Sequence, residues 1–211
     1  TATNPGILAP GIGDSATNNQ TMTFSSTSGI TAANGSQLQM SITTPTLNAS
    51  NGTVSAWLTS NQDLNTYLTA NPSSVSLVNI APATYGDMDY INLTGGTLSL
   101  GTRSSGTFGN GSLLIQDNGW LSGAAAGDLF NLFDWVSAMT GTFSTPGTLT
   151  TGGAYGDIDL PTLSGTLSWD LSALSSHGIA AVVNVVPEPS RALLILLGMF
   201  GLLARRRRSG C

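Results

Sequence analysis

Short stretches of alternating apolar and polar residues, separated by glycine and asparagine, constrain the fold of this chain more than any other feature. Residues 21–25 read Thr-Met-Thr-Phe-Ser and residues 38–42 read Leu-Gln-Met-Ser-Ile. Successive side chains of a β-strand point to opposite faces, so each stretch places its apolar groups on one face. Asn34-Gly35 and Asn51-Gly52 are typical of tight turns. The pattern predicts a mainly β protein built from short strands.

One segment has the spacing of a helix instead. Its apolar residues recur three or four positions apart, which places them on one side of a helix. These residues are Val54, Trp57, Leu58, Leu64, Tyr67 and Leu68. Asn71-Pro72 ends the pattern, because the residue before a proline is biased away from the helical conformation. The first region, residues 1–82, is therefore expected to be a Ser/Thr/Asn-rich β region with one short amphipathic helix over residues 54–70.

An internal repeat marks the second region, residues 83–186. The segment Tyr-Gly-Asp-Met-Asp followed by Leu-Thr-Gly-Gly-Thr-Leu-Ser spans residues 85–99, and a close copy with one glycine fewer spans residues 155–168. Short strands and glycine turns at this spacing are typical of a β-solenoid or a β-sandwich. We expect a right-handed parallel β-helix, with the β-sandwich as the alternative. Two copies fall short of the three or more coils that a solenoid needs, so the prediction requires further coils upstream of Thr1.

The charge distribution of the 211-residue chain excludes one class of partner. The sequence has no lysine, and Arg103 is the only basic residue before Arg191. The part up to residue 186 carries ten aspartates and that arginine, a formal charge of −9. Such a surface does not neutralise phosphates, so we expect no nucleic-acid partner. The single cysteine is Cys211, so no disulfide forms within the region before it.

Two pairs of aspartates in the repeat are candidate metal ligands. Asp87 with Asp89, and Asp157 with Asp159, stand two residues apart. In a strand, such residues project from the same face and present carboxylate oxygens, the ligands that calcium prefers. The alternative is that glycine and aspartate only mark the beginning of a strand. A weak calcium site is the one cofactor that the sequence suggests.

The residues needed for catalysis are scarce. His177 is the only histidine, and Glu188 is the only glutamate. A Ser176, His177 and Asp170 arrangement is conceivable, but the chain has no Gly-x-Ser-x-Gly turn, and the histidine lies in what reads as a surface turn. We therefore expect a protein that is not an enzyme.

The four tryptophans allow two interpretations. They are Trp57, Trp120, Trp135 and Trp169. Exposed indoles stack on sugar rings, whereas tryptophans of β-rich domains more often lie in the core. The core interpretation is favoured, and a carbohydrate-binding module stays as the alternative.

The last part of the chain has the pattern of a membrane anchor. Val186 to Ser190 is proline-rich, an apolar run extends from Ala192 to Ala204, and the cluster Arg205, Arg206, Arg207 and Arg208 follows. Thirteen helical residues span about 20 Å, against about 30 Å for the hydrocarbon core. The pattern predicts a short C-terminal transmembrane helix with the arginines in the cytoplasm and the rest of the chain outside. The alternative is a buried core helix.

This tail resembles the PEP-CTERM sorting signal of Gram-negative bacteria. Pro187, Glu188 and Pro189, the short apolar run and the arginine cluster occur in the order of that signal over residues 187–208. The resemblance implies recognition of the tripeptide by exosortase, a membrane-embedded processing enzyme of exopolysaccharide-producing, biofilm-forming species. It makes the chain a substrate and gives it no activity of its own. The terminal Ser209-Gly210-Cys211 departs from the family, which usually ends near its arginines.

Residues 83–186 also resemble a module that precedes this signal in exported PEP-CTERM proteins. The likeness lies in residues 127–135, Gly-Asp-Leu-Phe-Asn-Leu-Phe-Asp-Trp, and residues 160–170, Leu-Pro-Thr-Leu-Ser-Gly-Thr-Leu-Ser-Trp-Asp. It implies an extracellular β-rich passenger with no known catalytic residue.

The expected function combines these observations. We expect an exported cell-surface or extracellular-matrix protein with a structural or adhesive role, held briefly at the inner membrane and then released to the surface. Export implies that a signal peptide precedes Thr1 in the precursor. Exopolysaccharide is a candidate partner. The alternatives are a carbohydrate-binding module and the non-catalytic C-terminal part of a β-helical polysaccharide-active enzyme.

Overall fold

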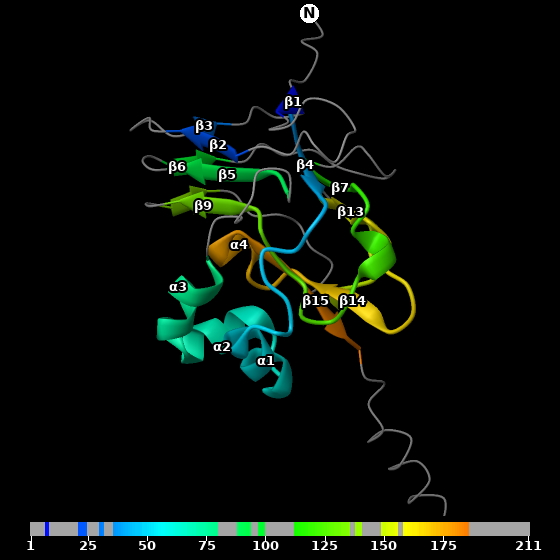
Figure 1. Ribbon diagram of the computed structural model, residues 1–211. Helices are drawn as coiled ribbons and strands as arrows, with labels where there is room; N and C mark the ends of the chain where they lie inside the picture. Colours follow the sequence, from blue (N-terminus) through cyan, green and yellow to red (C-terminus); the bar gives the residue numbers. More distant parts are fainter. Residues whose placement is uncertain are drawn as a thin grey trace, which may run out of the picture.

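The computed structural model in Figure 1 describes ten segments of the chain. These are residues 7–8, 21–24, 30–31, 36–79, 88–93, 97–99, 112–135, 138–140, 149–155 and 158–185. The sorting tripeptide, the apolar run, the arginine cluster, Asp87 and Asp157 lie outside them. Within these segments, no helix is long and apolar enough to cross a membrane. The prediction of a mainly β protein is confirmed for the described segments.

Three sheets consist largely of parallel strands. The first contains β2 (Thr21–Phe24), β5 (Tyr90–Leu93) and β9 (Phe133–Trp135). The second contains β3 (Ile30–Thr31), β6 (Thr97–Ser99) and β10 (Ala138–Thr140). The third contains β1 (Ile7–Leu8), β4 (Gln37–Ile42), β7 (Leu113–Asp117) and β13 (Ile158–Leu160), with β12 (Gly153–Tyr155) added antiparallel at its edge.

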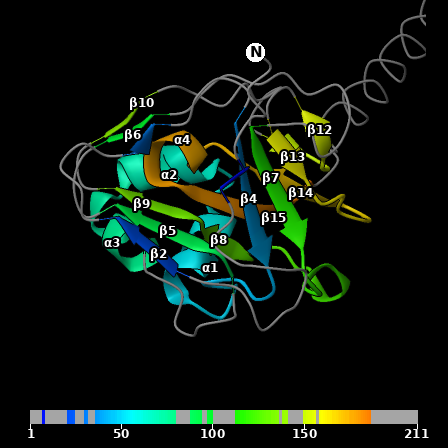
Figure 2. The same cartoon turned by 90° about the horizontal axis from the view of Figure 1, so that it is seen from above.

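The chain passes through these three sheets in the same order three times. It follows β2, β3 and β4, then β5, β6 and β7, and then β9, β10 and β13. Each strand therefore pairs with the strand of the preceding pass, and Figures 1 and 2 show the resulting layers. Strands from before and after residue 82 share all three sheets.

A fourth sheet is antiparallel. Its strand order is β11 (Leu149–Thr150), β14 (Leu167–Asp170), β15 (Ile179–Asn184) and β8 (Leu129–Asn131). The last strand along the chain, β15, is thus a central strand of this sheet, with β14 on one side and β8 on the other.

Two helices occupy the segment in which the sequence predicted a single helix. Helix α1 spans Gly52–Thr59 and α2 spans Leu64–Ala70. Asn61 has φ 55°, a left-handed conformation that interrupts the helical hydrogen bonds. Asp63 then caps α2 by accepting a hydrogen bond from the Thr66 backbone N–H. The predicted position was correct, but the segment forms two helices and not one.

In the described part of the chain, four further short helices lie outside that segment. They are η1 (Pro72–Ser74), α3 (Val75–Val78), η2 (Leu121–Gly123) and α4 (Leu174–His177). Helices α1 to α3 form one lobe at the end of the molecule that carries the antiparallel sheet (Figure 1).

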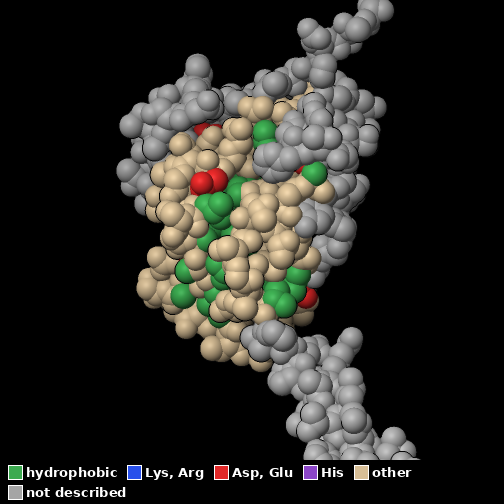
Figure 3. All heavy atoms as spheres, turned by 90° about the vertical axis from the view of Figure 1, so that its right-hand side faces the viewer, with side chains coloured by type: hydrophobic (Ala, Val, Ile, Leu, Met, Phe, Trp, Pro, Cys, Tyr) green, Lys and Arg blue, Asp and Glu red, His purple; other side chains and the backbone are tan. Residues whose placement is uncertain are grey.

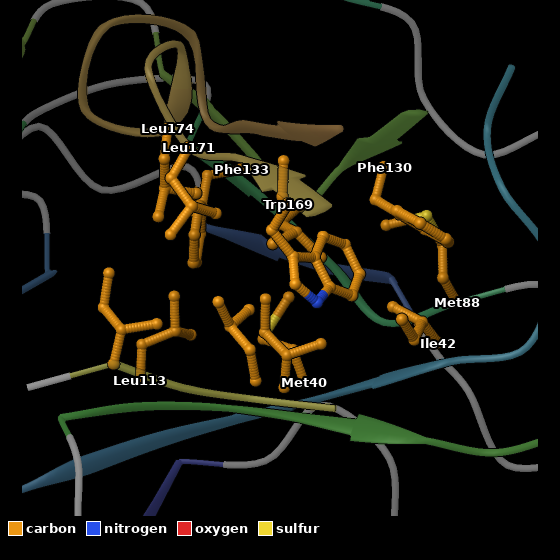
Figure 4. Packing of buried hydrophobic residues seen from close by; sticks show 14 of the residues in the cluster. Met40, Ile42, Met88, Leu113, Phe130, Phe133, Trp169, Leu171 and Leu174 are labelled. Carbon is orange, nitrogen blue, oxygen red and sulfur yellow. The ribbon is translucent and has the colours of Figure 1, made fainter. Parts of the chain in front are cut away.

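The hydrophobic core has two clusters. The first lies between the parallel sheets and the antiparallel sheet, and Figure 4 shows Trp169 in its midst. Trp120 packs edge-on against Phe130, with ring centroids 4.9 Å apart. The second cluster joins the helical lobe to the other face of the antiparallel sheet. It includes Val54, Trp57, Leu64, Leu68, Val78, Leu129, Ala173, Ile179 and Ala181.

The two copies of the sequence repeat occupy different places in the fold. The described part of the first copy forms β5 and β6, in two of the parallel sheets. The described part of the second copy forms β13, in the third parallel sheet, and β14, in the antiparallel sheet. Similar sequences therefore form strands in different sheets, and the strand β14 is antiparallel to its neighbours where its counterpart β6 is parallel.

A glycine substitution tests the packing between α4 and β9. Gly178 has φ +72°, and a Cβ placed on it would lie 2.1 Å from the carbonyl oxygen of Phe133. Gly165 has a similar φ of +68° with nothing within 4 Å of the corresponding position. We expect Gly178→Ala to lower the free energy of unfolding by about 3 kcal/mol, combining left-handed strain with overpacking. Gly165→Ala carries only the strain, about 1 kcal/mol.

Urea unfolding followed by tryptophan fluorescence measures both values. Equal losses in the two variants would contradict the packing described here.

Candidate functional site: the buried carboxylates

The two described members of the predicted calcium site lie inside the protein. Asp89 is 2 % exposed, and its Oδ2 accepts a hydrogen bond from the Ser41 backbone N–H at 2.7 Å. Asp159 is 0 % exposed, lies on β13 opposite Leu114 of β7, and also interacts within the protein. Among the described residues, no group of three or more His, Cys, Asp or Glu side chains is arranged to hold a metal ion.

Asp128 is a buried carboxylate that the sequence did not single out. Its Oδ2 accepts hydrogen bonds from the Trp120 indole N–H at 2.8 Å and from the Ala125 backbone N–H at 2.9 Å. The aspartate thereby fixes the turn that leads into β8 and orients an indole that packs in the first core cluster. Its function is to shape the fold.

Asp170, which the sequence suggested only as a conceivable partner of His177, is also buried, and it connects the antiparallel sheet to the helical lobe. It lies at the end of β14 and is 0 % exposed. Oδ2 accepts the Leu64 backbone N–H at 2.8 Å, and Oδ1 accepts the Ser172 backbone N–H at 2.9 Å. The first bond serves the first residue of α2, where a free N–H donor meets a negative charge favourably.

Burial changes the acidity of Asp170. Desolvation raises its pKa, hydrogen bonds from Ser172 and Leu64 lower it, and the nearby charge of Asp63 raises it, so that the pKa lies above the ordinary 3.8. Asp63 itself shows the opposite net shift. Desolvation raises the pKa of Asp63, but hydrogen bonds from Thr66 and Ser172 outweigh it and hold the pKa below 3.8.

Four of the described aspartates are buried: Asp89, Asp128, Asp159 and Asp170. None of them has a lysine or arginine beside it among the described residues, because the described part of the chain contains neither. Where the hydrogen bonds are defined, backbone and indole N–H groups supply the compensation. Donors of this kind stabilise a carboxylate without a counter-ion. A carboxylate surrounded by such donors has few lone pairs left for a ligand.

A further hydrogen-bonded group, formed by Tyr90, Asp134 and Asn79, lies on the outer side of the first parallel sheet. The Tyr90 hydroxyl donates to Oδ2 of Asp134, and the Asn79 side-chain amide donates to Oδ1, both at 3.4 Å. Burial and the Asp134 charge raise the pKa of Tyr90 far above 10.0, so this phenol stays protonated and donates. Oδ1 of Asn79 is buried and has no hydrogen-bond partner among the described residues.

The structure does not assemble the conceivable Ser176, His177 and Asp170 triad. The Ser176 hydroxyl donates to the Asn65 side-chain oxygen at 2.7 Å, and Asp170 is engaged with backbone N–H groups. His177 ends α4, is half-buried, and makes no side-chain hydrogen bond to a described residue. Burial lowers the pKa of His177 below 6.5, so the imidazole is neutral at pH 7. The histidine thus ends a short helix where the sequence indicated a surface turn.

Three of the four tryptophans lie in the core, as the favoured interpretation predicted. Trp57, Trp120 and Trp169 are 1 %, 5 % and 0 % exposed. The indole N–H of Trp57 donates to the Gln62 carbonyl, and that of Trp169 donates to the Pro161 carbonyl. These three indoles are not available to stack on a sugar. The Trp135 side chain lies outside what the structure describes.

The described surface is poor in charge. Four of the seven described aspartates are buried, so these four add no negative charge to the described surface. In the face shown in Figure 3, uncharged polar groups and backbone dominate, and carboxylates are sparse. Leu77, Leu149 and Val185 are the large hydrophobic side chains that are exposed among the described residues.

Comparison of the chain with protein-family models, with characterised proteins and with solved structures found no match.

The sequence contained a signal for the burial of Asp128 and Asp170, which was not predicted. Asp128 immediately precedes the apolar stretch at residues 129–133, and Asp170 directly follows Trp169 in an otherwise buried strand. A charged residue in such a position is either at a strand end or satisfied by hydrogen bonds. The identity of the donors requires the tertiary structure, because Leu64 is 106 residues away from Asp170.

The link between Asp170 and α2 can be tested by substitution. In Asp170→Asn, the amide oxygen keeps one backbone bond, while the NH₂ group faces the other donor. We expect the free energy of unfolding to fall by about 1–3 kcal/mol, the cost of an unsatisfied buried group. Asp117→Asn is the matched control, since Asp117 is exposed and one amide oxygen suffices to accept its bond from the Leu121 N–H. Equal losses in chemical denaturation would contradict the assignment.

The raised pKa of Asp170 predicts how the loss of stability in Asp170→Asn depends on pH. Because the pKa of Asp170 is raised on folding, the folded protein holds the proton more tightly, and the aspartate adds stability below pH 3.8 that is lost as pH rises through the raised pKa. The penalty of Asp170→Asn should therefore be larger at pH 3.5 than at pH 7. A penalty that grows with pH would show that the carboxylate is stabilised in its charged form.

The calcium site stays a prediction, and thermal unfolding tests it. Ligation by Asp87, Asp89, Asp157 and Asp159 would raise the melting temperature in calcium over that in chelator, because a ligand that binds only the folded state stabilises it. The rise should disappear in Asp87→Asn/Asp157→Asn, which leaves the buried pair untouched. An unchanged melting temperature would rule out the site.

Proposed function

We propose that this chain is an exported structural or adhesive protein of the cell surface or extracellular matrix, and not an enzyme. One observation carries the proposal: Pro187-Glu188-Pro189, an apolar run and Arg205–Arg208 follow one another directly after the folded domain. A short apolar helix with a cluster of arginines orients the chain with its bulk outside the cytoplasm.

The route of delivery follows from the same tail. The chain is held at the inner membrane of a Gram-negative bacterium by the C-terminal helix, with its folded part outside. An exosortase-type enzyme recognises the tripeptide and separates the domain from its anchor. The product remains at the surface or in the biofilm matrix, where exopolysaccharide is its candidate partner.

The finer fold that we propose is a parallel β-helix of three coils. The repeated passage through three parallel sheets supports this arrangement over the β-sandwich, whose sheets are antiparallel. The coils begin with β2, β5 and β9, so they include strands from before residue 82. The antiparallel sheet and the helical lobe lie at the end of this stack of coils, beyond the last coil (Figure 1).

The described residues support a passive role. Their buried carboxylates, where the bonds are defined, accept internal hydrogen bonds, and their surface is largely uncharged. A surface rich in hydroxyl and amide groups suits a hydrated polysaccharide matrix, because both partners exchange hydrogen bonds with water and with each other.

Mapping the C-terminus tests the proposal. The chain expressed in a host that carries an exosortase should lose its last residues at or near Pro187-Glu188-Pro189, as mass spectrometry of the extracellular form would show. Replacement of the tripeptide by Ala-Ala-Ala should abolish this processing and leave the chain with the membrane fraction. An extracellular form with an intact C-terminus would contradict the proposal.

A further inference from the structure

The position of β15 fixes where the folded domain ends. This strand lies between β14 and β8, and Ile179, Ala180, Ala181 and Val182 are 0 % exposed. Beyond the strand, the Val185 backbone N–H still donates to the Thr166 carbonyl at 2.8 Å. The Thr166 hydroxyl donates to the Asn184 side-chain oxygen at 3.2 Å. The chain is therefore bound to the domain as far as Val185.

The sorting tripeptide begins two residues later. An extended chain advances at most about 3.6 Å per residue, so Pro187 lies within about 7 Å of the last bonded residue. The apolar run begins at Ala192, seven residues from Val185, which allows at most about 25 Å between the domain and the membrane-embedded segment. An enzyme that acts on the tripeptide therefore has to bind it between the folded domain and the membrane, within these distances.

We infer that processing takes place against the folded domain, and that the residues after Val183 must separate from the domain before the processing enzyme can engage the tripeptide fully. The inference rests on the proposed function. Cleavage breaks one backbone C–N bond, with water adding a hydroxyl to the acyl carbon and a proton to the released amine. To bind an extended substrate on the N-terminal side of Pro187, the enzyme needs residues that the domain holds.

The structure indicates how far this release extends. Exposure rises along β15, from buried residues 179–182 to partly buried Val183 and exposed Asn184. Asn184 and Val185 separate without opening either core cluster, whereas Val183 packs against the second cluster and Val182 belongs to the first. Local opening of strand ends is the least costly motion of a folded domain. The surface presented to the enzyme is uncharged and consists of Thr166, Asn184 and Val185, which is 40 % exposed.

A spacer experiment tests the inference. A six-residue Gly-Ser insertion between Val186 and Pro187 supplies the enzyme with free residues, so that β15 no longer has to open. We expect processing to be about five- to 150-fold faster in pulse–chase labelling of the full chain, the factor for two net hydrogen bonds of about 0.5–1.5 kcal/mol each. Deletion of Val186 should slow processing. The same spacer inserted after Ser122, an exposed residue of η2, should leave the rate unchanged.

The outcomes separate this inference from the proposed function. If the unmodified chain is not processed at all, the proposed function fails. If it is processed and the spacer leaves the rate unchanged or lowers it, the proposed function stands and the inference is wrong. Mass spectrometry of each product checks that the cleaved bond has not moved.

Discussion

Strand β15 is the element on which the rest of this structure depends. Its alternate side chains enter different clusters: Ala180 and Val182 face the first, and Ile179 and Ala181 face the second. Removal of large aliphatic side chains such as Ile179 and Val182 from water contributes about 1.5–3 kcal/mol each. Because β15 also pairs with β14 and β8, one strand holds together the parallel sheets, the antiparallel sheet and the helical lobe.

The hydrogen bonding of the buried carboxylates gives the domain its chemical character. In a chain without lysine, burying aspartates would leave them uncompensated unless N–H donors replaced counter-ions. Asp128 and Asp170 illustrate the solution, each accepting two hydrogen bonds that also fix a turn or a helix start. The composition suggests a negatively charged surface, but these aspartates lie inside the protein, where they accept hydrogen bonds that hold the fold. The described part of the surface is mostly uncharged.

The sequence predicted local structure better than pairing. Alternation at residues 21–25 and 38–42 correctly indicated strands, and the helical spacing after Val54 was correct apart from the break at Asn61. Period-two alternation shows which side chains share a face, but it does not identify the neighbouring strand. The pairing of β2 with β5, almost seventy residues away, therefore required the structure. The repeat did not identify the strand pairing either, since its copies lie in different sheets.

Native-state hydrogen exchange tests most directly whether β15 unites the domain. The backbone N–H groups of Leu64, bonded to Asp170, and of Ala181, in the middle of β15, belong to the helical lobe and to the antiparallel sheet. If β15 joins both clusters into one cooperative unit, these two amides exchange with the same free energy, equal to that of global unfolding. Exchange of Leu64 at a much lower free energy than Ala181 would show that the helical lobe opens independently, and would contradict this account.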